Sequence, residues 1–153
     1  IAPDEGGLTN FRSPSFDPKT GLFIVSAHPS WSIYFSNPAD GTYGWAGGDY
    51  GLWGKGVLEA IDYQTGKIRW SHELGPDGPG AGVMTTDSGL TFTGDAQGNF
   101  LALRTSNGET LWHAGAGAGI ASSPITYELD GHQYLLTSGG GVMFAWRLPE
   151  GTR

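Results

Sequence analysis

Histidines and acidic side chains are the residues of this 153-residue chain that could carry acid–base or metal chemistry. The acids stand singly in turn-like stretches, without the spacing of a calcium loop. The four histidines also lack a metal-ligand spacing; they are His28, His72, His113 and His132. The chain has no cysteine and no Gly-x-Ser-x-Gly sequence, which excludes a thiolate ligand, a disulfide and the common nucleophile motifs. The spacing of these residues therefore predicts no metal site, and none of the common nucleophile motifs is present.

Charge and glycine patterns exclude other classes of protein. The formal net charge is −7 with no basic run, so the electrostatic signature of nucleic-acid binding is missing and no nucleic-acid partner is expected. The stretch GAGAG at 115–119 has the wrong spacing for a dinucleotide-binding loop, and no helix is expected after it. No apolar run approaches the roughly 20 residues of a membrane helix.

Two segments of the chain share a spacing that points to a repeat. Residues 60–70 read AIDYQTGKIRW and residues 102–112 read ALRTSNGETLW, so an alanine, a glycine and a tryptophan recur after a step of 42 residues. We expect Asp62 to accept backbone N–H groups across a turn in which Gly66 adopts positive φ. Trp70 then lies on the next strand, where it can pack flat against a neighbouring sheet.

Short β-rich runs separated by turn signals recur about every ten residues, and helical periodicity is nearly absent. We expect eleven strands, at 11–16, 22–27, 56–62, 67–74, 81–86, 90–95, 99–104, 109–115, 122–128, 132–139 and 142–148. The hairpins at 13–27, 82–95 and 123–139 align as three copies. A four-strand unit of about 40–45 residues is the period of a β-propeller blade. The sequence therefore predicts an all-β partial propeller of about two and three-quarter antiparallel blades, with an antiparallel sandwich as the alternative.

An insert at 28–55 separates the first hairpin from the rest of its blade. It is rich in glycine and in aromatic residues, namely Trp31, Tyr34, Phe35, Tyr43, Trp45, Tyr50 and Trp53. Aromatic side chains exposed at loop tips would suit a carbohydrate-binding surface. If they are buried, they would instead form a loop packed over the propeller face as a satellite cluster. The sequence leaves both possibilities open.

Three longer stretches carry a more specific signal beside AIDYQTGKIRW. They are GGLTNFRSPSFDPKTGLFIVSA (6–27), AGVMTTDSGLTFTGDAQGNFLAL (81–103) and GAGIASSPITYELDGHQYLLTSGGG (117–141). Together they resemble the quinoprotein alcohol dehydrogenases that use pyrroloquinoline quinone (PQQ), whose tryptophan-docking motif is similar to residues 60–70. The resemblance covers nearly the whole chain and is to the C-terminal part of those enzymes.

The resemblance implies an eight-bladed propeller, of which residues 1–153 would be a C-terminal fragment. It implies periplasmic oxidation of alcohols or related sugars by hydride transfer to PQQ, with Ca²⁺ or a lanthanide held by residues outside this chain. Electrons would then pass to a cytochrome or a quinone acceptor. The family's metal ligands, catalytic base, active-site arginine and cysteine pair belong to segments that this sequence does not contain. We therefore expect this chain alone to be inactive.

Matching the family's motifs residue by residue implies five cofactor-binding positions: Asn10, Phe11, Ala81, Gly82 and Val142. Asn10 matches the asparagine whose side chain contacts PQQ, and Phe11 stands where the family has tryptophan. Gly80 replaces another tryptophan, so contact there would come from the backbone of Ala81 and Gly82. Val142 follows the closing glycines, where the family places a further backbone contact. Taken by itself, Asn10 would be an ordinary turn residue.

Two other functions stay open at this stage. One is a non-catalytic PQQ-like repeat scaffold that binds protein partners, although such a scaffold would not need the segment around Asn10. The other is carbohydrate binding by the insert. A partial propeller exposes radial faces and unpaired strand edges, so we also expect the chain to associate with the remaining blades or with copies of itself.

Overall fold

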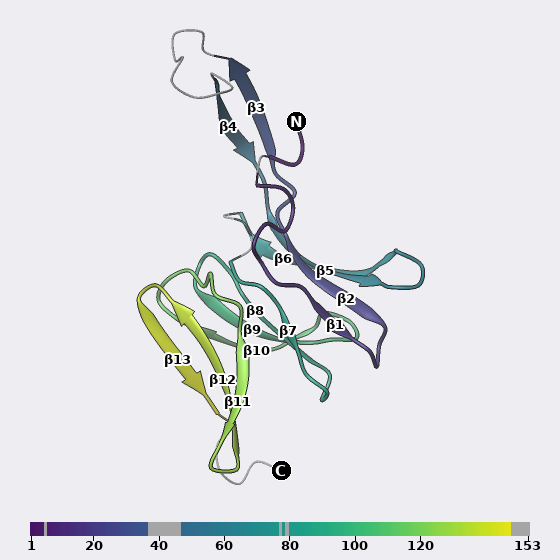
Figure 1. Cartoon of the computed structure of the whole chain (residues 1–153), viewed down its shortest axis with the longest axis vertical. Helices are drawn as coiled ribbons and strands as arrows, with labels where there is room; N and C mark the ends of the chain where they lie inside the picture. Colours follow the sequence, from purple (N-terminus) through teal and green to yellow (C-terminus); the bar gives the residue numbers. More distant parts are fainter. Residues whose placement is uncertain (5, 37–46, 77, 79, 148–153) are drawn as a thin grey trace.

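The computed structural model describes residues 1–4, 6–36, 47–76, 78 and 80–147 (Figure 1). These residues form thirteen strands: β1 (Ser15–Asp17), β2 (Leu22–Ala27), β3 (Trp31–Ser36), β4 (Gly47–Trp53), β5 (Gly56–Asp62), β6 (Ile68–Gly75), β7 (Met84–Thr85), β8 (Leu90–Gly94), β9 (Asn99–Arg104), β10 (Thr110–Gly115), β11 (Ile125–Leu129), β12 (His132–Gly139) and β13 (Val142–Trp146). Within the described ranges, no helix has the length and apolarity needed to cross a membrane.

The strands build three blade-like antiparallel sheets. The first has the order β1-β2-β5-β6, the second runs from β7 to β10, and the third holds β11, β12 and β13. Strands that neighbour one another in a sheet are also consecutive in sequence, apart from the β3–β4 insertion between β2 and β5. This arrangement confirms the predicted all-β partial propeller of two four-stranded blades and most of a third.

The insert is not the loop that its composition suggested. β3 and β4 form an antiparallel two-stranded ribbon with Trp31 opposite Trp53 and Ile33 opposite Tyr50. Figure 1 shows this ribbon projecting from the first sheet, away from the second and third sheets. Large apolar residues occupy every second position of WSIYFS, which is the period of a strand and explains the difference. Tyr43 and Trp45 lie outside the described residues.

The first strand of each sheet begins later than predicted. β1 starts at Ser15, β7 at Met84 and β11 at Ile125, three or four residues after the predicted starts. The reason is visible ahead of β7, where the backbone N–H of Val83 donates to the carbonyl of Ser13 at 2.8 Å. The Val83 N–H therefore pairs with the first sheet instead of extending the ladder within the second sheet.

Two apolar clusters hold the three sheets together. The cluster between the first and second sheets comprises Leu22, Ile24, Leu58, Ala60, Leu74, Val83, Leu101 and Leu103, with Trp70 packed against it. The cluster between the second and third sheets comprises Ala81, Phe100 and Ile120, with Phe92, Ala116, Leu135 and Trp146 against it. Burial of these side chains between the sheets is the main force that fixes the blades side by side.

The turn from β5 to β6 has the predicted chemistry. Asp62 Oδ1 accepts hydrogen bonds from the backbone N–H groups of Gln64 and Thr65, both at 3.0 Å. Gly66 has φ of 69°, the left-handed conformation that the sequence predicted. Trp70 follows on β6, and its Nε1 donates to the carbonyl of Thr105 in the second sheet at 2.9 Å. The repeated segment therefore joins neighbouring blades.

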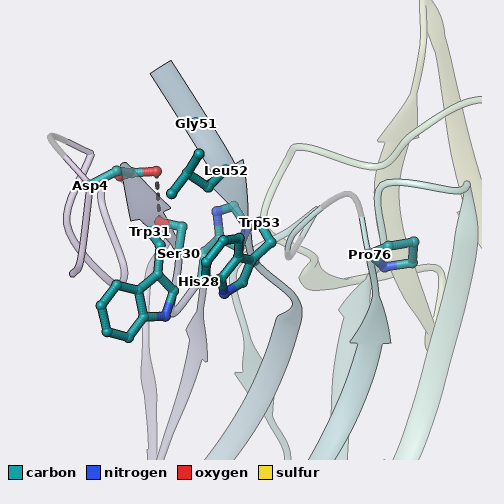
Figure 2. A pocket seen from close by; sticks show the side chains of 9 residues that line it. Asp4, His28, Ser30, Trp31, Gly51, Leu52, Trp53 and Pro76 are labelled. Carbon is teal, nitrogen blue, oxygen red and sulfur yellow. Dashed lines mark hydrogen bonds between the residues drawn. The ribbon is translucent and has the colours of Figure 1, made fainter. Parts of the chain in front are cut away.

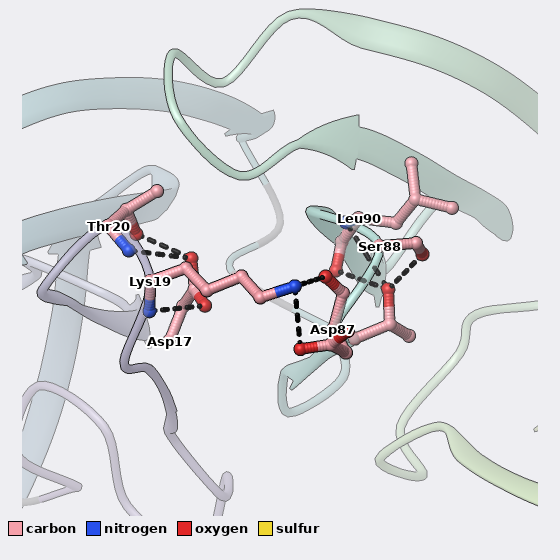
Figure 3. Close-up of polar contacts among 7 residues, drawn as sticks. Asp17, Lys19, Thr20, Asp87, Ser88 and Leu90 are labelled. Atoms are coloured by element: carbon pink, nitrogen blue, oxygen red, sulfur yellow. Dashed lines mark hydrogen bonds and ion pairs between the residues drawn. The ribbon is translucent and has the colours of Figure 1, made fainter.

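At the same end of the sheets, a second polar contact joins the first and second sheets (Figure 3). Lys19 Nζ lies 2.7 Å from the Asp87 carboxylate and also donates to the Asp87 carbonyl at 2.8 Å. Asp17 closes the turn that carries Lys19, because its carboxylate accepts from the Thr20 hydroxyl at 2.6 Å. Both partners of the ion pair are exposed, so we expect it to align the two turns while adding little stability.

Candidate functional site

The strands β1, β7 and β11 all begin at one edge of the propeller, which we call the start edge. Two contacts bring these beginnings together: the Val83–Ser13 backbone hydrogen bond, and a 2.7 Å hydrogen bond from Ser13 Oγ to Ser123 Oγ. Because neighbouring strands are antiparallel, β2, β8 and β12 end at this edge, whereas β5 and β13 begin there. All five residues matched to the cofactor site lie at the start edge or directly beneath it.

Residues 10–12 form the exposed part of this site. Asn10 has φ of 49° in a turn that leaves its side chain exposed, and Phe11 is 71% exposed. The guanidinium carbon of Arg12 lies 5.1 Å from the centre of the Phe11 ring, and Arg12 Nε donates to the carbonyl of Gly80 at 3.3 Å. An amide, an aromatic ring and a cation are thus held next to the segment that precedes β7.

Arg12 was missed by sequence reasoning, although it directly follows Asn10 and Phe11. Arg12 is placed at the site by its hydrogen bond to the carbonyl of Gly80, a residue distant in sequence that the sequence alone does not connect with it. Burial lowers the pKa of the Arg12 guanidinium because desolvation disfavours the charged form, but an arginine stays protonated near neutral pH. The start edge therefore carries a partly desolvated positive charge.

Ala81 and Gly82 lie beneath this surface and are buried. The N–H of Ala81 donates to the carbonyl of Gly94 at 2.9 Å, and the carbonyl of Gly82 accepts from the Thr93 hydroxyl at 3.1 Å. A Cβ placed on Gly82 would collide with Ser123 Oγ and would lie 2.8 Å from the backbone nitrogen of Ser13. Glycine is thus required here for the close approach of the first and third sheets.

Val142 lies at the same edge but on the third sheet. It is the first residue of β13 and is 55% exposed. The neighbouring N–H of Gly140 donates to the carbonyl of Gly119 at 3.4 Å, which ties this turn to the segment before β11. The structure therefore brings Asn10, Phe11, Ala81 and Gly82 into one neighbourhood and leaves Val142 further along the start edge.

A shallow pocket of roughly 260 Å³ lies where the ribbon joins the first sheet (Figure 2). Asp4 accepts a 2.6 Å hydrogen bond from Ser30 Oγ, and Trp31 and Trp53 line the pocket beside them with ring centres 6.0 Å apart. His28 also lines it, and Gly54 is required beside the His28 ring because a Cβ there would overlap Nε2. The pocket is thus lined both by polar side chains and by aromatic rings.

In the part of the chain that the structure describes, no three His, Cys, Asp or Glu side chains gather as metal ligands would.

The fold is a partial β-propeller of antiparallel blades, and one of its edges carries an amide, an aromatic ring and a cation. Residues 51–135 match the PQQ family of glucose/ethanol/alcohol dehydrogenases, in its β-propeller domain. The chain belongs to this family.

Individual relatives agree with this assignment. The chain is 36% identical over 156 residues to the quinoprotein ethanol dehydrogenase of Pseudomonas putida, an alignment that covers 95% of this chain and 25% of that protein. Among solved structures, a europium-containing methanol dehydrogenase is 29% identical with a TM-score of 0.76, covering 90% of this chain and 26% of that one. The quinohemoprotein alcohol dehydrogenase ADHIIG of Pseudomonas putida HK5 shares the fold, with a TM-score of 0.80 at 24% identity, over 92% of this chain and 23% of that one. The chain thus spans about a quarter of the length of the curated relatives that it matches.

Proposed function

We propose that this chain is the C-terminal portion of a quinoprotein dehydrogenase that oxidises alcohols, or related sugars, with PQQ in the periplasm. In this proposal the start edge supplies part of the cofactor's surroundings, and residues outside this chain supply the rest. The observation that carries the proposal is the gathering of Asn10, Phe11 and Arg12 on the surface next to the backbone of Gly80.

The chemistry of these side chains fits a planar, anionic, aromatic group. The Asn10 amide can donate and accept hydrogen bonds, as a quinone or carboxylate oxygen requires. Phe11 offers an exposed ring for stacking, and Arg12 adds a positive charge beside it. Ala81 and Gly82 would lie beneath the cofactor, where their small size leaves room for it. Val142 would make a further contact along the edge.

The described residues do not supply the remaining parts of the chemistry. PQQ, when bound, is the group that accepts hydride from the substrate. Ca²⁺ or a lanthanide would be held by residues outside this chain, as would the base that takes the hydroxyl proton. A cytochrome or a quinone would receive the electrons. This chain alone would therefore bind part of the cofactor's surface without oxidising a substrate.

Alcohol-dependent reduction of an artificial dye tests this proposal. The full-length protein, supplied with PQQ and either Ca²⁺ or a lanthanide, is expected to reduce the dye with ethanol or butanol, and the 153-residue chain is not. Dye reduction by the 153-residue chain would contradict its inactivity. If the full-length protein shows no PQQ binding and no reduction with any alcohol or sugar, the non-catalytic scaffold becomes the better description.

The pocket beside the ribbon favours carbohydrate binding as a second candidate function. Exposed tryptophan faces stack on sugar rings, and Asp4 and Ser30 could accept hydrogen bonds from hydroxyl groups. Retention on an immobilised polysaccharide that is lost in Trp53→Ala would support this function. If the unaltered chain is not retained at all, the function is excluded.

A further inference from the structure

One face of the β3–β4 ribbon consists of large apolar side chains that are exposed. Successive residues of a strand point to opposite faces, and residues opposite each other on paired strands share a face. A register irregularity opposite the step from Trp31 to Ser32 shifts the alternation on β4 by one residue. The register therefore places five side chains together, all of them about half exposed or more: Trp31 (48%), Ile33 (53%), Phe35 (51%), Tyr50 (68%) and Trp53 (65%). We call these five residues the apolar face. On the other face Ser32 is buried and Tyr34 is partly buried, so the ribbon is two-sided.

The second and third sheets do not cover the apolar face, since the ribbon points away from them (Figure 1). The sequences of β3 and β4 contain a single charged residue, Asp49, and no lysine or arginine. This composition is unfavourable for an anionic membrane surface, which attracts basic residues. The face thus suits a protein surface that is itself apolar.

The backbone of Ile1 indicates where such a surface would come from. Ile1 and Ser32 exchange two backbone hydrogen bonds, with Ser32 N–H donating to the Ile1 carbonyl at 3.0 Å and the Ile1 amine donating to the Ser32 carbonyl at 2.9 Å. This exchange is the pattern of an antiparallel strand pair. In a longer chain, residues preceding Ile1 would therefore run beside β3 toward the tip of the ribbon.

The size of the apolar face distinguishes between a second copy of the chain and a covalently linked segment as its occupant. Five half-exposed side chains of this kind present an area on the order of 500 Å². A free-standing dimer typically buries about 800 Å² on each partner, so the face is small for a second copy of the chain. A covalently linked segment needs less area, because its effective concentration is high.

We propose that the apolar face is the docking surface for the part of the full-length propeller that precedes Ile1. This inference rests on the proposed function only in taking the chain as the C-terminal portion of a longer propeller. The preceding polypeptide runs along β3 and its blades cover the five side chains. The ribbon then connects this chain to the rest of the propeller. In that arrangement its Trp31–Trp53 pair is covered and does not bind a polysaccharide.

Hydrogen exchange on the full-length protein, prepared without PQQ, tests the docking separately from cofactor binding. Backbone amides of 31–36 and 50–53 are expected to exchange at least about tenfold more slowly in the full-length protein than in the 153-residue chain. Ile33→Ser is expected to lower the melting temperature of the full-length protein and to leave that of the 153-residue chain unchanged. Tyr63→Ser, in the exposed turn at the other edge, is the matched control and should shift both forms equally.

Equal exchange of the ribbon in the two forms would overturn the proposal. Protection in the 153-residue chain that grows with its concentration would also overturn it, and would assign the apolar face to a second copy. Because PQQ is left out, failure of the cofactor proposal would change neither result.

Discussion

The indole of Trp70 and the backbone of Gly108 lie in contact across the boundary between the first and second blades. A Cβ built on Gly108 would lie 2.6 Å from Cε3 of the Trp70 ring, and the same ring donates through Nε1 to the carbonyl of Thr105 at 2.9 Å. The tryptophan of one repeat thus packs on the glycine of the next. Both residues belong to the pattern that recurs at the step of 42 residues.

Trp70→Phe should destabilise the chain by about 1–3 kcal/mol, because it keeps most of the packing while leaving the buried Thr105 carbonyl without its indole donor. Urea denaturation followed by circular dichroism measures this change. Trp53→Phe is the control, since Trp53 is 65% exposed on the ribbon and should change stability by less than about 0.5 kcal/mol. Equal effects of the two substitutions would argue against the inter-blade hydrogen bond.

Gly108→Ala should cost more stability than Gly66→Ala. Both glycines have positive φ, 74° and 69°, so alanine pays about 1–2 kcal/mol of backbone strain at either position. Only at Gly108 would the new methyl group also meet the Trp70 ring, since nothing lies within 4 Å of a Cβ at Gly66. Overpacking should add about 1–3 kcal/mol, measured as the difference between the two denaturation midpoints. Midpoints that coincide would show that the Trp70–Gly108 contact is not tight.

Gly82→Ala tests the approach of the first and third blades at the start edge. The methyl group would collide with Ser123 and press on the backbone of Ser13, at an expected cost of about 1–3 kcal/mol. Gly115→Ala is the matched control, because nothing lies within 4 Å of a Cβ there. Thermal melting compares the two variants, and a Gly82→Ala chain as stable as Gly115→Ala would contradict the packing.

Acid should remove a contribution of Asp62 to stability. The backbone N–H of Thr65 is the main cause that lowers the pKa of the Asp62 carboxyl, with further hydrogen bonds from Gln64 and Arg69. A pKa that is lower in the folded than in the unfolded chain means that the carboxylate stabilises the fold above the ordinary value of about 3.9. That contribution is lost as the pH falls through the folded pKa.

Comparison of the wild-type chain with Asp62→Asn measures this effect. The variant keeps an acceptor oxygen but carries no charge, so the stability difference between the two proteins should shrink as the pH is lowered below about 4. Chemical shifts of Asp62 followed by NMR give its pKa directly. A stability difference that stays constant across this range would show that the carboxylate charge plays no part.

The fold was predictable where local patterns decide it. Turn signals and the 42-residue step gave the eleven strands of the three blades, and Asp62 and Gly66 adopt the predicted turn chemistry. The ribbon was missed because its glycine content outweighed the alternation in WSIYFS. The late starts of β1, β7 and β11 depend on pairing between residues such as Ser13 and Val83, which no local pattern encodes.

The candidate site likewise has a part that the sequence could predict and a part that it could not. Asn10 and Phe11 were proposed from their match to a short family motif, and the structure leaves both exposed in a turn before β1. The position of Arg12 depends on Gly80, and the burial of Gly82 depends on Ser123 in another blade. Both are consequences of how the sheets pack against one another, so the sequence alone could not supply them.

Calorimetric titration of the full-length protein with PQQ, with and without Ca²⁺, tests the central claim most directly. Asn10→Ala is expected to weaken PQQ binding by about tenfold or more, because a hydrogen bond to a charged group is worth about 1.5–3 kcal/mol. Asn107→Ala is the control, since Asn107 closes the turn from β9 to β10 by accepting from the N–H of Glu109 at 3.1 Å. An unchanged PQQ affinity in Asn10→Ala would contradict the assignment of the start edge as part of the cofactor site.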